Sequence, residues 1–237
     1  MVKKIILKFF HFIRHILTAL RNHCSPFTTP LRMYEMFEKE QIKNCYETFK
    51  THFQKSILLD YKNYHKFIIE RAKENDPLNK KFYLEFGVWK GTTINIFSKY
   101  VNTIYGFDSF EGLREDWAGT SCQKGTNNLN KKLPVLNKNV IPVIGWVQDT
   151  LGPFLDKHKT DINFVHLDMD TYESTKFVLT KIKPYLTKNC YIAFDELYNY
   201  PGWEMGEYRA LKETFNDNEY KYVCFSKDGT QVMIQVV

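Results

Sequence analysis

The 237-residue sequence is poor in the features that mark several protein classes. It has five cysteines, none in a Cys-x-x-Cys pair, and only 11 glycines and eight prolines. These numbers exclude a collagen-like or low-complexity chain and a disulfide scaffold. An odd, unpatterned set of cysteines suits a reducing compartment, so we expect a cytoplasmic protein. With 43% apolar and 25% charged residues, the chain is long enough for one large α/β domain with an appendage.

Acidic residues are absent from the first 33 positions, which carry six basic residues: Lys3, Lys4, Lys8, Arg14, Arg21 and Arg32. Subtracting these six from 33 leaves 27 Lys and Arg residues against 27 Asp and Glu, so the rest of the chain is neutral. A nucleic-acid-binding domain would carry its basic surface on the folded part. We therefore expect no nucleic-acid partner.

Residues 1–30 are predicted to form a basic amphipathic leader helix and a linker marked by Pro26 and Pro30. Between residues 3 and 22, polar residues recur every three or four positions, which draws one polar stripe along a helix. Its uncharged runs do not exceed six residues, too short for a membrane span, and a small-x-small cleavage site is missing. Two interpretations stay open: residues 1–22 lie peripherally on the inner membrane surface, or the helix packs on the domain or a second subunit.

Residues 31–77 are predicted to be a helical extension that ends at the breaker Asn75-Asp76-Pro77. Over residues 78–237, short apolar runs alternate with helical segments, which predicts a Rossmann-like α/β domain with a mostly parallel, seven-stranded sheet. The turn at Asp228-Gly229 returns the last strand as an antiparallel C-terminal hairpin. We expect strands at 82–86, 102–107, 140–144, 162–167, 190–194, 220–225 and 230–236, and helices near 91–100, 150–158, 172–186 and 205–216.

Ligands of such a sheet bind beyond the carboxyl ends of its strands. The first strand ends in a glycine turn, Gly87 and Gly91, which lacks the third glycine of a dinucleotide fingerprint and so favours a nucleoside without a diphosphate. Asp108 lies 21 residues after Gly87, where an acid hydrogen-bonds a ribose diol; a helix cap or turn former is the alternative. Gly145 and Trp146, after the third strand, are placed to border an adenine.

Four carboxylates follow the next two strands: Asp168 and Asp170 after one, Asp195 and Glu196 after the other. Neighbouring strands lie about 4.8 Å apart, and like charges at that spacing repel unless a cation lies between them. Asp168, Asp195 and Glu196 offer the hard oxygen ligands that Mg²⁺ prefers. The alternative is that one or two of the acids, Asp170 above all, cap the following helices. We interpret His166 as a strand residue and not as a ligand.

Five segments follow one another in an order typical of a known enzyme family: Leu-Glu-Phe-Gly-Val-Trp-Lys-Gly (84–91), Tyr-Gly-Phe-Asp-Ser-Phe-Glu-Gly-Leu (105–113), Gly-Trp-Val-Gln-Asp-Thr-Leu (145–151), His-Leu-Asp-Met-Asp-Thr-Tyr-Glu-Ser-Thr (166–175) and Pro-Gly-Trp-Glu-Met-Gly-Glu-Tyr-Arg-Ala-Leu (201–211). The sequence resembles the macrocin O-methyltransferase (TylF-type) family of class I S-adenosylmethionine-dependent methyltransferases. The resemblance covers about residue 82 to the C-terminus.

This resemblance implies a class I methyltransferase fold, S-adenosylmethionine as methyl donor, Mg²⁺ held by Asp168, Asp195 and Glu196, and Asp170 as general base. Around the cofactor it places Glu85, Gly87, Gly91, Asp108, Ser109, Gly145, Trp146 and Asp168. Family members commonly methylate sugar hydroxyls, often as dimers or larger assemblies. The resemblance therefore implies a homodimeric sugar O-methyltransferase with a small-molecule or glycan substrate. The family often has Asp at the position of Glu196.

Tyr172 and Trp203 are the candidate substrate contacts; Trp203 is either a sugar-stacking platform or a buried tryptophan. The polar, asparagine-rich segment 114–139 is too long for a simple connector and is predicted to close over the substrate as a lid, a disordered excursion being the alternative. Other functions stay open. One alternative is a methyltransferase whose acceptor is an amine, a phenol or a membrane-presented glycan. Two others are a dinucleotide-binding oxidoreductase and an inactive binding module.

Overall fold

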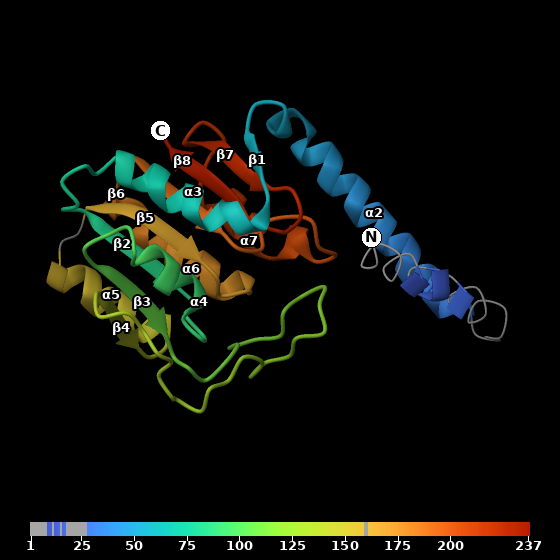
Figure 1. The fold of residues 1–237 in the computed structure, drawn as a ribbon, viewed down its shortest axis with the longest axis horizontal. Helices are drawn as coiled ribbons and strands as arrows, with labels where there is room; N and C mark the ends of the chain where they lie inside the picture. Colours follow the sequence, from blue (N-terminus) through green and yellow to red (C-terminus); the bar gives the residue numbers. More distant parts are fainter. Residues whose placement is uncertain (1–8, 11, 15, 18–27, 159–160) are drawn as a thin grey trace. The chain divides into compact units, whose positions relative to one another are not determined.

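The computed structural model describes residues 9–10, 12–14, 16–17, 28–158 and 161–237 (Figure 1). The chain divides into two compact units, residues 1–41 and residues 42–237. Most of the predicted leader helix lies outside the described residues; those described between residues 9 and 17 are helical. The linker assignment is wrong at residues 28–30, because helix α2 (Thr28–Phe53) begins there. Proline is tolerated in the first turn of a helix, so Pro30 does not end one.

The described residues of the second unit include eight strands, which form one sheet in the order β1-β7-β8-β6-β5-β2-β3-β4. The strands are β1 (Ile57–Leu59), β2 (Phe82–Phe86), β3 (Ile104–Asp108), β4 (Val140–Ile144), β5 (Ile162–Leu167), β6 (Leu186–Phe194), β7 (Tyr220–Ser226) and β8 (Val232–Val236). Only β8 is antiparallel to its neighbours β6 and β7. The order reverses between β2 and β5, which makes this the switch point of the sheet.

Helices cover both faces of the sheet (Figure 1). Besides α2, the helices are α3 (Tyr61–Glu74), α4 (Thr92–Phe97), α5 (Val147–His158), α6 (Tyr172–Ile182) and α7 (Glu207–Thr214), with short 3-10 turns η1 (Lys183–Tyr185) and η2 (Trp203–Met205). On one face, α3 and α4 pack around Tyr83 and Phe164. On the other, α5, α6 and α7 pack around Phe86 and Val165. Alternate residues of each buried strand thus serve opposite faces.

The seven predicted strands are all present, with ends displaced by a few residues, and β8 returns antiparallel beside β7 as the Asp228-Gly229 turn predicts. The predicted strand count is wrong by one. Residues 57–59, assigned to the helical extension, form an eighth strand that pairs in parallel with β7. Three apolar residues are too few to show a period of two, so this strand depends on its distant partner.

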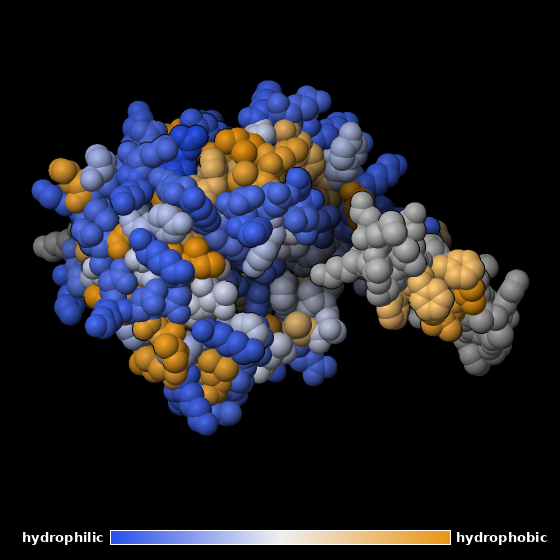
Figure 2. All heavy atoms as spheres, in the orientation of Figure 1, coloured by the Kyte–Doolittle hydropathy of each residue, from blue (hydrophilic) through white to orange (hydrophobic). Residues whose placement is uncertain are grey.

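The surface in view is mostly hydrophilic, with an apolar patch near the end of the sheet formed by β1 and β7 (Figure 2). In β1, Ile57 and Leu58 are 40% and 49% exposed.

None of the described helices combines the length and apolar character that a membrane crossing requires.

Candidate active site

A pocket of about 400 Å³ lies at the carboxyl ends of the central strands, on both sides of the switch point. The loops after β2, β3, β4, β5 and β6 all contribute to its wall, together with Tyr61 of α3. This is where an open α/β sheet binds its ligands. Residues predicted from the sequence that line the pocket are Gly87, Asp108, Ser109, Gly145, Trp146, Asp168, Asp170, Asp195 and Glu196.

Gly87 brings the loops after β2 and β5 together. Its φ of +88° lies in the left-handed region that favours glycine. A Cβ atom at this position would lie 1.7 Å from the carbonyl oxygen of Asp168. The glycine turn is therefore required for backbone contact across the switch point, a reason that the glycine spacing does not reveal. Gly91 has φ +77° as the N-cap of α4 and lies outside the pocket wall.

Asp108, the last residue of β3, holds the turn after β2. Its Oδ2 accepts hydrogen bonds from the backbone N–H groups of Val88 (2.8 Å) and Trp89 (2.7 Å), and its Oδ1 accepts one from Phe110 (2.6 Å). Each carboxylate oxygen has two lone pairs, so the group can also accept from a ligand hydroxyl. Asp108 therefore acts as a turn former, and its carboxylate also lines the pocket.

The third loop continues the same wall. The backbone N–H of Gly145, whose φ is +134°, donates to the carbonyl oxygen of Asp108 at 3.0 Å. Trp146 lines the pocket, and the Arg114 guanidinium lies 5.8 Å from its ring centroid. Ser109 is buried, and its Oγ accepts the Glu111 N–H at 3.1 Å. Main-chain hydrogen bonds thus fix this side of the pocket before any ligand binds.

The opposite side carries the predicted acids. Asp168, Asp195 and Glu196 each offer a carboxylate oxygen, and these oxygens all lie within 4.8 Å of one another. They converge because β5 and β6 are neighbours, with Leu167 paired to Phe194. Within the described part of the chain, the buried Oδ1 of Asp195 and Oε2 of Glu196 have no hydrogen-bond partner. Hard oxygen donors without a protein partner fit Mg²⁺.

The acids disfavour one another's ionisation. Burial, followed by the charge of Asp195, raises the pKa of Asp168 and of Glu196 well above the ordinary carboxyl value. Burial also opposes ionisation of Asp195, but its interactions with His166 and Glu196 outweigh this and lower its pKa to about 2. A bound cation would remove the repulsion that these shifts report.

Asp170 follows β5 in a left-handed conformation, φ +65°, which is uncommon for a residue with a side chain. It is 7% exposed, and the side-chain amide of Asn127 donates to its Oδ2 at 3.3 Å. Burial and the charge of Asp195 raise the pKa of Asp170 to about 7. The capping alternative is wrong, because Thr171 is the N-cap of α6. A carboxyl group that titrates near neutral pH is suited to accept a proton.

The two candidate substrate contacts lie outside the pocket wall. Trp203 is 1% exposed and packs against Phe49 and Tyr208, with ring centroids 5.7 and 4.8 Å away, so its predicted stacking on a sugar is wrong. The Tyr172 hydroxyl donates to Glu213 at 2.6 Å, away from the acids that line the pocket. Both residues belong to the packing behind the site.

Glu85, predicted at the cofactor, also lies outside the wall. It is fully buried, and Thr93, which does line the pocket, donates to its Oε1 at 3.2 Å. The sequence reasoning missed Glu207, whose Oε2 accepts the backbone N–H of Glu196 at 3.0 Å. Its position in the first turn of α7 could be read from the sequence, but its contact with the acid cluster could not.

The long segment 114–139 contributes Arg114, Trp117 and Asn127 to the pocket wall. Backbone hydrogen bonds tie it to the preceding residue, from Leu113 N–H to Thr126 O and from Gly125 N–H to Leu113 O, both 2.8 Å, and within itself from Trp117 N–H to Cys122 O at 2.9 Å. The segment therefore has a defined conformation beside the site and is not a disordered excursion. Its closure as a lid stays a prediction.

Comparison with known proteins agrees with this geometry. Residues 84–197 match the model of a family described as a methyltransferase domain, and this range holds the glycine turn, Asp108 and all four acids. The chain is an enzyme of the methyltransferase class. The match opposes the dinucleotide-binding oxidoreductase alternative.

Solved structures share the fold. CalS11, described as a calicheamicin methyltransferase, superposes with a TM-score of 0.61 at 22% identity, covering 89% of this chain and 93% of that one. An apo structure of CalS11, described as a TDP-rhamnose 3'-O-methyltransferase, gives 0.54 at 22% identity, covering 89% and 95%. The O-methyltransferase NovP gives 0.50 at 22% identity, covering 74% and 80%. A search of curated proteins finds no match.

Proposed function

We propose that the chain is an S-adenosylmethionine- and Mg²⁺-dependent O-methyltransferase of the macrocin type that acts on a sugar hydroxyl. The observation that carries the proposal is the pairing of two unlike walls in one pocket. The nucleoside wall is formed by the loops after β2, β3 and β4 and has Asp108 in the position of a ribose-binding acid. The acid wall is formed by Asp168, Asp195 and Glu196, whose carboxylates have oxygens within 4.8 Å of one another.

The named relatives support the choice of acceptor. CalS11 is described as a TDP-rhamnose 3'-O-methyltransferase and NovP as an O-methyltransferase, and both share this fold. The pocket also suits O-methylation of an alcohol, because a metal site next to the nucleoside wall would activate an acceptor hydroxyl beside the methyl donor. An alcohol is a weak nucleophile until its proton is removed.

The chain's own residues would divide the work as follows. The turn at Gly87 and the Asp108 carboxylate orient the nucleoside, and Trp146 borders its base. Asp168, Asp195 and Glu196 would hold Mg²⁺, which supplies a Lewis acid that makes a bound hydroxyl more acidic. Asp170 would accept the hydroxyl proton on its carboxylate. Bound S-adenosylmethionine would supply the methyl group to the hydroxyl oxygen and leave as S-adenosylhomocysteine. Segment 114–139 keeps water from the pocket.

Calorimetry tests the two walls separately. Titration of the full chain with S-adenosylhomocysteine and with NAD should show binding of S-adenosylhomocysteine alone. Titration with Mn²⁺, before and after EDTA has been used to strip bound metal from the protein, should show one divalent-cation site. Tighter binding of NAD would refute the cofactor assignment. Binding of S-adenosylhomocysteine with no divalent-cation site would leave a methyltransferase that works without a metal. Turnover is then measured with sugar nucleotides, phenols and amines.

We also propose a homodimer and peripheral contact of residues 1–22 with an anionic membrane surface at the cytoplasmic side. The basic, apolar composition of the leader supports the second assignment. Deletion of residues 1–22 should abolish cosedimentation with anionic vesicles if the leader binds lipid. A change in oligomeric state with no change in vesicle binding would show that the leader binds protein instead.

A further inference from the structure

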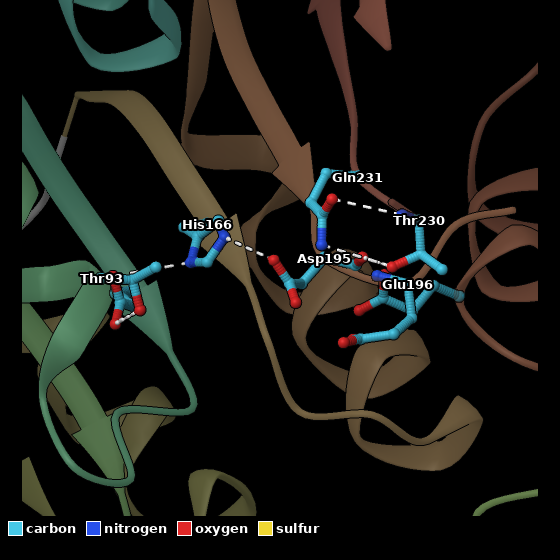
Figure 3. A network of polar contacts seen from close by, with 8 residues as sticks. Thr93, His166, Asp195, Glu196, Thr230 and Gln231 are labelled. Atoms are coloured by element: carbon cyan, nitrogen blue, oxygen red, sulfur yellow. Dashed lines mark hydrogen bonds and ion pairs between the residues drawn. The ribbon is translucent and has the colours of Figure 1, made fainter. Parts of the chain in front are cut away.

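A buried histidine lies between the two walls of the pocket. His166 is fully buried in β5, in register with Glu85 on β2 and Ala193 on β6. Figure 3 shows its ring between the Thr93 side of the site and Asp195. The sequence interpretation of His166 as a strand residue is confirmed, but its side chain also has polar neighbours.

Each nitrogen of the His166 ring faces a carboxylate. Nδ1 lies 3.5 Å from Oε2 of Glu85, and Nε2 lies 3.7 Å from Oδ1 of Asp195. These are ion-pair distances, and in the described part of the chain neither nitrogen has a hydrogen-bond partner. The imidazole also packs against the Phe97 ring in a T-shaped arrangement, with centroids 5.1 Å apart, which restricts its rotation.

Further hydrogen bonds hold Glu85 and the backbone of Asp195 in place. Thr93 donates to the other oxygen of Glu85 at 3.2 Å, so Glu85 is held from the cofactor side. The Asp195 backbone N–H donates to Leu167 O at 2.9 Å. Its carbonyl oxygen accepts a hydrogen bond from Thr230 Oγ1 at 2.6 Å (Figure 3). The Oδ1 of the Asp195 side chain lies 3.7 Å from the His166 Nε2, and a ring nitrogen of the buried His65 lies within 4.8 Å of ligand atoms of both residues.

We propose that His166 is a positioning residue: held by Glu85, it sets the rotamer of Asp195 so that its carboxylate faces the divalent cation between Asp168 and Glu196. The inference rests on the proposed function, because it requires that cation. Groups next to metal ligands commonly orient them, and their loss commonly weakens metal affinity by about 10- to 100-fold. A histidine that merely fills space would have no such effect.

The two ring nitrogens can be tested one at a time in the full-length protein. His166→Gln places an amide N–H near the position of Nε2, facing Asp195, whereas His166→Asn places it near Nδ1, facing Glu85. Mn²⁺ affinity is measured by electron paramagnetic resonance and S-adenosylhomocysteine affinity by calorimetry. We expect Mn²⁺ affinity to fall about tenfold or more in His166→Asn and to be largely restored in His166→Gln, with S-adenosylhomocysteine affinity unchanged in both.

A matched control is His158→Gln in α5, which makes the same change away from the acids and should leave both affinities intact. Equal Mn²⁺ affinity in His166→Asn and the unmodified protein would overturn the proposal. So would parallel loss of Mn²⁺ and S-adenosylhomocysteine binding in both variants, since that indicates collapse of the strand. An unmodified protein that binds no Mn²⁺ would instead refute the proposed metal site.

If the His166 variants do not fold, Glu85→Gln tests the same link, because it retains the shape of the side chain but removes the charge that holds Nδ1. Mn²⁺ affinity should then fall while the free energy of unfolding changes little. Unchanged Mn²⁺ affinity in a folded Glu85→Gln protein would refute the role of Glu85 in holding the ring.

Discussion

The two walls of the pocket are built differently. On the nucleoside wall, main-chain N–H groups satisfy Asp108, and Gly87 lets two loops touch through their backbones. On the acid wall, carboxylate oxygens crowd together and two of them lack hydrogen-bond partners among the described residues. The first wall is complete as folded. The second is held against its own repulsion, which a bound cation would relieve.

Replacing Gly87 should break the nucleoside wall. Gly87→Ala drives a Cβ into the backbone of Asp168, which no rotamer change relieves, so we expect a loss of about 4 kcal/mol or more in unfolding free energy. Binding of S-adenosylhomocysteine should be lost. Gly125→Ala is the control, since Gly125 has a similar φ of +85° but no neighbour within 4 Å; it should cost about 1 kcal/mol. Equal costs in urea denaturation would show that backbone conformation alone matters.

Removing the proposed base, Asp170, should leave both walls intact and stop the reaction. Asp170→Asn retains the size of the side chain but cannot accept the proton, so kcat should fall about 10²- to 10⁴-fold. Affinities for S-adenosylhomocysteine and Mn²⁺, measured by calorimetry, should stay unchanged. Normal turnover in this variant would reassign the base to another group.

Changing one acid should separate stability from metal binding. Glu196→Gln removes a buried ionisable group whose pKa is raised by burial and by the neighbouring acids, so the metal-free protein should gain about 1 kcal/mol of stability, in the way that functional sites trade stability for activity. Its Mn²⁺ affinity should fall about tenfold. Thermal unfolding in EDTA and in Mn²⁺ measures both effects. Glu204→Gln, at an exposed acid, is the control; a less stable metal-free Glu196→Gln protein would contradict the repulsion argument.

The smallest effect is expected outside both walls. Tyr172→Phe removes the hydroxyl that donates to Glu213, and the hydrogen bond contributes about 1 kcal/mol or less. Because Tyr172 does not line the pocket, kcat and KM should not change. A large rise in the acceptor KM, measured by steady-state kinetics, would return Tyr172 to the substrate site.

Much of the site could be predicted because the sequence pattern shows where each strand ends. A buried apolar run followed by Asp168 or Asp195 shows where the carboxyl edge lies, and parallel strands share that edge. Trp203 could not be placed in this way. A tryptophan after a glycine turn reads the same whether it is exposed to a ligand or buried, and packing by Phe49, far away in the sequence, decides between them.

The sequence by itself determined the alternation of strands and helices, the antiparallel last strand, and the set of acids that can hold a cation. These follow from local periodicity, turn chemistry and side-chain charge. Only the tertiary structure decided that β1 joins the sheet, that Gly87 touches Asp168, and that His166 lies between Glu85 and Asp195. Such contacts depend on the register and packing of segments distant in the chain, which local patterns do not specify.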